Sequence, residues 1–209
     1  MKMIRAVILC LCMTLLFSLN VHAEEEKQSA EYIENEELWK IAIKVGDLYD
    51  IDSAILVSLV DSESTRNIYA INGTHKGLTQ VTAKWHQNRM DRLGVEDLYD
   101  PYGSILVCAD YLSELLDIGE NKGYGYSMAY ALMRYNMATD TANSMYARGE
   151  ISNYAKKIID RAEDYQEEKE KWEAKYLLEK SMEDLKKKKQ AIVLAKSLGS
   201  KYLMDHIEE

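Results

Sequence analysis

The sequence is short of cysteine, proline and phenylalanine, and the cysteine shortage excludes one class of fold. Of its three cysteines, Cys10 and Cys12 lie in an apolar N-terminal segment, which leaves Cys108 alone in the rest of the chain. A single cysteine cannot form an internal disulfide, so a disulfide-stabilised secreted scaffold is excluded. Cys108 lies in an apolar helical pattern, which favours a small buried hydrophobe over a nucleophile.

An excess of positive charge is also missing, because 35 acidic residues outnumber 26 basic ones and give a net charge of −9. Nucleic acid binding depends on Lys and Arg contacts to phosphate, so we expect no nucleic acid partner. The histidines His75 and His86 have no Cys or carboxylate neighbours at the spacing of metal ligands. We therefore assign no metal and no cofactor.

The first 23 residues have the pattern of a secretory signal peptide. Lys2 and Arg5 precede an apolar run from Ala6 to Leu19, and Val21-His22-Ala23 resembles a cleavage site. We therefore expect an exported protein that is secreted or associated with the cell envelope. The apolar run is short for a membrane span, and an uncleaved anchor is the less favoured alternative. Residues 24–35 form a short acidic linker.

Helical periodicity is nearly continuous from residue 36 to residue 160, and strand signals are almost absent. This pattern predicts an all-α domain over 36–160. Glycine clusters mark the breaks, and the only proline, Pro101, follows Asp100 as expected at a helix start. The periodicity predicts helices over residues 36–49, 53–64, 101–116 and 126–136.

Residues 161–209 are predicted to form a charged helical extension. Glu and Lys pairs recur there at helical spacing, and a narrow apolar seam contains Leu178, Met182, Leu185 and Ile192. One interpretation is a solvated helix or hairpin that folds back on the domain. The other is a coiled coil or a helix that binds a protein partner. The oligomeric state stays open.

A carboxylate interrupts an apolar helix in the stretch SLVDSEST, residues 58–65. At 3.6 residues per turn Glu63 shares a stripe with Leu56 and Leu59, whereas Asp61 is expected at the surface. Loss of hydration raises the pKa of a carboxyl group and can keep it protonated near neutrality. A protonated carboxyl is the general acid that cleavage of a glycosidic bond needs. From the spacing alone, a solvated helix-end glutamate is the alternative.

Motifs downstream of Glu63 resemble, in order, those of the soluble lytic transglycosylases, the SLT-domain family related to goose-type lysozyme. The resemblance covers about residues 37 to 160. The matching residues are Glu63-Ser64, Asn67 and Ala70, Gly77-Leu78-Thr79-Gln80, Asp97-Leu98-Tyr99-Asp100-Pro101, Ile105, Ala109-Asp110-Tyr111-Leu112, Leu115-Leu116, Arg134-Tyr135-Asn136 and Tyr154-Ala155-Lys156-Lys157-Ile158.

The resemblance implies a lysozyme-like all-α fold and peptidoglycan glycan strands as the substrate. Glu63 would protonate the oxygen that links N-acetylmuramic acid to N-acetylglucosamine. It would then take a proton from the 6-hydroxyl of the sugar, which closes a 1,6-anhydro ring without water. The resemblance also implies substrate-binding roles for Ser64, Gln80, Tyr135, Asn136 and Tyr154, and it implies that the Tyr154 hydroxyl lies near Glu63.

Two other functions are open at this point. The first is a goose-type-like muramidase, in which the same Glu63 activates water. The second is an SLT-like binding or assembly component of the cell envelope with weak or lost catalysis. Arg66 replaces the usual Phe of the family and Thr79 the usual Met, so we expect a different groove shape and substrate preference. Trp85 is either a sugar-stacking platform or an ordinary core tryptophan.

Overall fold

The computed structural model describes residues 30–197, so the predicted signal peptide and the last residues of the extension lie outside the described range. The chain divides into the units Met1–Glu31 and Tyr32–Glu209, and all the elements described here belong to the second unit. These residues form helices and one short hairpin, which confirms the all-α prediction. Within the described range, no helix has the length and hydropathy to cross a membrane.

The predicted helices are all present, and their ends differ slightly from the expected ones. The long helix that starts at Pro101 continues past the expected end at residue 116, because buried Gly119 still packs against Tyr130 in its last turns. The elements are α2 (Asn35–Tyr49), α3 (Ser53–Glu63), β1 (Ile71–Asn72), β2 (His75–Lys76), α4 (Ala83–Leu93), α5 (Pro101–Asn121), α6 (Met128–Asn136), α7 (Thr139–Ala147), α8 (Asn153–Asp164) and α9 (Gln166–Ser197).

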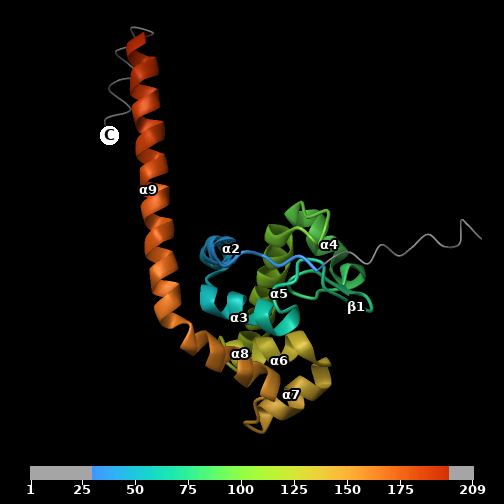
Figure 1. Ribbon diagram of the computed structural model, residues 1–209. Helices are drawn as coiled ribbons and strands as arrows, with labels where there is room; N and C mark the ends of the chain where they lie inside the picture. The colour runs from blue at the N-terminus through green and yellow to red at the C-terminus, as the bar shows by residue number, and fades with distance from the viewer. Residues whose placement is uncertain (1–29, 198–209) are drawn as a thin grey trace, which may run out of the picture. The chain divides into compact units, whose positions relative to one another are not determined.

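Helix α3 lies between α2 and α8 and is buried along most of its length (Figure 1). The Asp52 carboxylate caps it by accepting a 2.8 Å bond from the backbone N–H of Ala54. Every residue from Ser53 to Val60 is buried. A helix that is apolar on all sides is stable only when other elements surround it. The core therefore fixes α3 and the direction of its last turn.

Helix α5 supports the other side of the core and packs against α2 and α6. Asp100 caps its start by accepting a 2.6 Å bond from Gly103 N–H, and Pro101 occupies the first turn. Leu112, Leu115 and Leu116 are almost fully buried, and each contributes about 1.5–3 kcal/mol through the removal of apolar surface from water. Helices α2, α3, α5, α6 and α8 share one apolar cluster.

The first half of α9 is bound to the domain by ion pairs. Lys169 lies 2.9 Å from Asp52, the N-cap residue of α3, and Lys175 lies 2.7 Å from Glu36 of α2. Beyond these contacts the predicted seam is exposed at Leu178, Met182 and Leu185. The predicted domain boundary after residue 160 falls within α8, which continues to Asp164.

Candidate active site

Glu63 is the last residue of α3, and it meets Tyr154 from the start of α8. The Tyr154 hydroxyl donates a hydrogen bond to Glu63 Oε1. Ser152 places this tyrosine by capping α8, with its Oγ accepting a 3.2 Å bond from Ala155 N–H. The two residues that the resemblance joined are thus in direct contact.

Burial raises the pKa of Glu63, because a carboxylate loses hydration in this setting. The Tyr154 hydrogen bond and an electrostatic interaction with His75 act in the opposite direction but are smaller effects. Burial also raises the pKa of Tyr154, so its phenol keeps the proton that it donates. The arrangement gives a carboxyl group that holds its proton to higher pH than an exposed glutamate, with its orientation fixed by one donor.

Other carboxylates that could act at the site are engaged elsewhere. Asp97 is exposed and accepts a bond from Tyr99 N–H, and Asp91 is exposed and accepts one from Gln87. Among the described residues, no other carboxylate contributes to the pKa shift of Glu63. Glu63 is therefore the single acidic group of this site in the described part of the chain.

The chain reverses direction directly after Glu63 through two residues with left-handed backbone. Thr65 has φ of 53° and Arg66 has φ of 68°, a conformation that is strained for residues with a Cβ and costs of order 1–3 kcal/mol each. A 3.0 Å bond from Ile33 N–H to Arg66 O holds the turn from outside. The turn exists because surrounding contacts compensate for its strain.

The Arg66 side chain supplies much of this compensation. Its Nε lies 2.6 Å from Asp61 Oδ1, and its Nη1 donates a 2.6 Å bond to Asn35 Oδ1. Tyr165 also donates a 2.7 Å bond to Asp61. The expectation that Asp61 is ordinary surface is wrong, because its side chain is only 13% exposed. Arg66 therefore stabilises the turn after Glu63, and it does not line the pocket that contains His75, Gln80 and Trp85.

The Gly77-Leu78-Thr79-Gln80 segment directly follows β2 and is held in place by close contacts. Gly77 has φ of +73°, and a Cβ there would lie 1.9 Å from Leu98 O, so only glycine fits. Thr79 is buried and its Oγ1 donates a 3.0 Å bond to Ser104 O. Thr79 therefore anchors the segment to α5 and, like Arg66, stays out of the pocket lining.

Gln80 uses its amide hydrogens within the loop. Its Nε2 donates to Ala70 O at 3.0 Å and to Gly77 O at 2.9 Å, which leaves Oε1 as the acceptor for an incoming group. Tyr135 of α6 contacts the same segment, because its hydroxyl donates a 2.7 Å hydrogen bond to Thr79 O. Beneath Tyr135 lies Cys108, which is fully buried.

Within the described part of the chain, two of the predicted binding residues, Ser64 and Asn136, form no side-chain hydrogen bond with Glu63, Tyr154 or the segment that contains Gln80, and neither lines the pocket that contains Gln80. Ser64 donates its hydroxyl to Val60 O at 3.1 Å, which completes the end of α3. Asn136 is the exposed last residue of α6, and no side-chain hydrogen bond links it to another described residue. Their predicted contacts with substrate stay predictions.

A pocket of about 200 Å³ includes His75 and Tyr135 in its lining, and both residues interact electrostatically with Glu63, which does not itself line the pocket. Trp85 lines it and is 77% exposed, so the interpretation as a core tryptophan is wrong. His75, which from the sequence was considered only as a metal ligand, lines the pocket and interacts electrostatically with Glu63. Its position in the loop between the Glu63 and Gln80 motifs was the available signal. The lining also includes Gln80, His86, Tyr111 and Tyr135.

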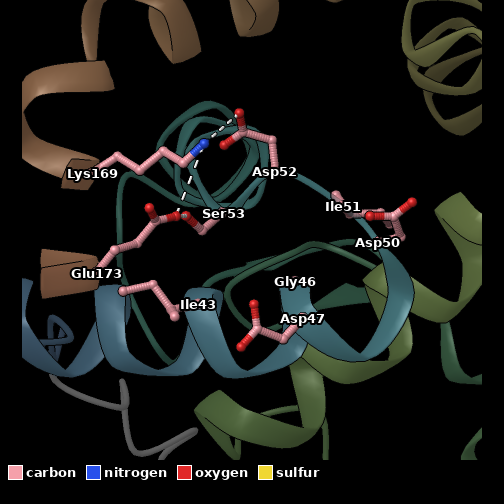
Figure 2. A pocket seen from close by; sticks show the side chains of 9 residues that line it. All are labelled: Ile43, Gly46, Asp47, Asp50, Ile51, Asp52, Ser53, Lys169 and Glu173. Atoms are coloured by element: carbon pink, nitrogen blue, oxygen red, sulfur yellow. Dashed lines mark hydrogen bonds and ion pairs between the residues drawn. The ribbon is translucent and has the colours of Figure 1, made fainter. Parts of the chain in front are cut away.

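A second pocket, of about 380 Å³, has a different character (Figure 2). It lies where the end of α2 and the start of α3 meet α9, and Asp47, Asp50 and Glu173 surround it. The Lys169 ammonium reaches across it to Asp52. Among the described residues, no group of three or more His, Cys, Asp or Glu side chains could hold a metal ion.

The sequence was compared with known proteins and protein families. A search of curated proteins gave no match. A family model described as the transglycosylase SLT domain matches residues 40–153. Glu63, Gln80 and Tyr135 lie inside the matched range, and Tyr154 directly follows it. Since the match covers more than half of the chain and the fold agrees with the lysozyme-like all-α fold of that domain, the chain belongs to the SLT transglycosylase family.

Proposed function

We propose that this protein is an exported peptidoglycan lytic transglycosylase. Membership of the SLT family supports lytic transglycosylase-type activity in general and peptidoglycan as the substrate. The specific reaction that we infer is cleavage of the β-1,4 bond between N-acetylmuramic acid and N-acetylglucosamine, with formation of 1,6-anhydro-N-acetylmuramic acid. Export is inferred from the charged and apolar pattern of residues 1–23.

The contact between Tyr154 and Glu63 in a desolvated setting carries the proposal. In the first step Glu63 donates its proton to the glycosidic oxygen as the bond breaks through an oxocarbenium-like state. In the second step the ionised Glu63 accepts the proton of the 6-hydroxyl, whose oxygen attacks the anomeric carbon. Glu63 gives one proton in the first step and takes one back in the second, which agrees with the absence, among the described residues, of a second carboxylate that acts on Glu63.

Tyr154 has a defined part in this cycle. Its hydroxyl donates to Oε1, so the proton that Glu63 gives to the substrate is held on the other carboxyl oxygen. After proton transfer the same hydrogen bond stabilises the carboxylate. Tyr154 therefore orients the acid and then supports the base.

Product mass tests the proposal. Purified sacculi digested with the protein should release muropeptides with anhydro ends, which are one water lighter than reducing ends. Reducing ends would instead make the protein a goose-type-like muramidase. Absence of any release, with binding to sacculi retained, would make it a binding or assembly component of the envelope.

A further inference from the structure

Trp85 is a large apolar side chain that the fold leaves in water. It is the third residue of α4 and is 77% exposed, whereas Trp39 is fully buried in the core. The Lys84 ammonium lies 5.3 Å from the centroid of its ring, and the indole has no place in either apolar cluster. An exposed aromatic beside a pocket is typical of a binding surface.

The pocket beside Trp85 is lined without Asp, Glu, Lys or Arg. The polar side-chain groups of its lining are the Gln80 amide, the Thr82 hydroxyl, two imidazoles and the hydroxyls of Tyr111 and Tyr135. His86 Nδ1 accepts a 3.3 Å bond from Arg89, and burial lowers the pKa of His86, so a neutral ring has its proton on Nε2. The pocket thus offers uncharged donors and acceptors next to aromatic surface.

This chemistry separates the pocket from the one in Figure 2, where four carboxylates and Lys169 gather. A charged peptide or a phosphate needs a charged partner when it leaves water. An N-acetylated sugar carries hydroxyls and an amide without charge, and the C–H groups of its ring form an apolar face. The aromatic walls of the pocket continue inward, with His86 and Tyr111 rings 4.6 Å apart and Tyr111 and Tyr135 rings 5.6 Å apart.

We propose that Trp85 is the stacking platform of a subsite that takes one N-acetylhexosamine ring of the glycan strand. His75 and Tyr135 line this pocket and interact electrostatically with Glu63, so the subsite would lie near the candidate acid, although Glu63 does not line the pocket. The choice of a glycan as ligand rests on the proposed function. The assignment of Trp85 to it rests on exposure and on the uncharged pocket.

Binding can be measured apart from catalysis in the full chain carrying Glu63→Gln. The probe is chitotetraose, a neutral oligosaccharide without a stem peptide. We expect a saturable change in tryptophan emission, because Trp85 is the most exposed of the three tryptophans and is therefore the most sensitive to ligand. Calorimetry should show affinity about tenfold weaker for Trp85→Ala and less than threefold weaker for Trp85→Phe.

Tyr126→Ala is the matched control, since Tyr126 is 50% exposed but lies on the loop between α5 and α6. It should leave the affinity for chitotetraose unchanged. On sacculi, Trp85→Ala should raise KM about tenfold with little change in kcat, because the residue touches the sugar but not the reacting atoms. Circular dichroism melting should show no loss of fold for a change at so exposed a position.

Two results overturn the inference. One is an affinity for chitotetraose that Trp85→Ala does not alter. The other is an emission change produced by a free stem peptide and not by chitotetraose. Either could occur while wild-type protein still releases anhydro muropeptides, so the subsite would fail and the proposed function would stand. Chitotetraose binding without any release of muropeptides would be the reverse case.

Discussion

The Tyr154 hydroxyl donates a hydrogen bond to Glu63 Oε1, although the two residues are 91 positions apart in the sequence. One residue ends a buried helix, and the other begins a helix that packs against it. The contact therefore depends on the packing of α3 against α8. A substitution that weakens the packing of α3 against α8 should therefore disturb the Tyr154–Glu63 hydrogen bond before it unfolds the rest of the domain.

Glu63→Gln should abolish cleavage while the fold is kept. The amide has the shape of the acid but no proton to give, so release of muropeptides should fall by at least about 10²-fold. Because the folded-state pKa of Glu63 is raised, wild-type stability should decline as the pH rises from the ordinary carboxyl value through the raised one. The variant lacks this decline, and its melting temperature above that window should equal or exceed that of the wild type. Unimpaired release by the variant would remove Glu63 from the mechanism.

Tyr154→Phe should lower kcat and move the pH profile. Loss of a hydrogen bond to an ionisable group predicts a decrease of about ten- to a hundredfold. Since that bond favours the ionised carboxylate, its removal raises the pKa of Glu63 further, and the alkaline limb of kcat should shift to higher pH. Tyr146→Phe, which removes a 2.7 Å bond to Ser127 Oγ, is the control and should leave the limb in place. A shift toward lower pH in Tyr154→Phe would contradict the assigned direction.

Arg66→Ala should destabilise the turn after Glu63. Without the Arg66 side chain, Asp61 keeps only its hydrogen bond from Tyr165, and the strained backbone at residues 65 and 66 loses contacts that hold it in place. We therefore expect a decrease of about 1–3 kcal/mol in the free energy of unfolding, measured by chemical denaturation. Arg148→Ala breaks the exposed pair with Glu150 and should leave stability almost unchanged, because solvent screens an exposed ion pair. Equal effects of the two substitutions would show that the Arg66 network is only a surface pair.

Truncation of α9 should show that residues 166–180, which form ion pairs with the domain, stabilise it, and that the residues after 180 do not. A chain that ends after Lys180 keeps the ion pairs with α2 and α3 and should retain its melting temperature and its activity on sacculi. A chain that ends after Asp164 loses Tyr165 and Trp172 from the core surface, which predicts about 3 kcal/mol of lost stability.

The exposed half of α9 is then tested by what it does besides catalysis. If residues after 180 bind a protein partner, their removal should change complex formation or oligomeric state without changing the rate of cleavage. A lower rate of cleavage in the chain that ends after Lys180 would show that residues after 180 contribute to catalysis, which would contradict this expectation.

Much of the fold could be predicted from the sequence because its signals are local. The apolar periodicity, the cap at Asp52 and the Asp100-Pro101 pair identify α3 and α5 within a few residues. The end of α5 could not be placed, because the helix continues where tertiary packing around Gly119 replaces an obvious apolar stripe. Propensity is a weak guide where packing decides.

The candidate site was predictable only in part, for the same reason. The stripe containing Glu63 follows from helical geometry, whereas its contact with Tyr154 came from family resemblance. Nothing local shows that Asp61 would turn inward, because its partners Arg66 and Tyr165 come from a strained turn and from the junction before α9. Trp85 was ambiguous because an apolar side chain at a helix start fits a core and a pocket equally well.

Cys108 lies beneath Tyr135 and is fully buried, and burial raises the pKa of its thiol to about 12. A thiol in this state presents almost no thiolate to an oxidant or an alkylating reagent. In the chain without residues 1–23 it is also the only cysteine. Its rate of alkylation therefore reports how often the packing around Cys108 and Tyr135 opens, and it does so in the unmodified protein without an added probe.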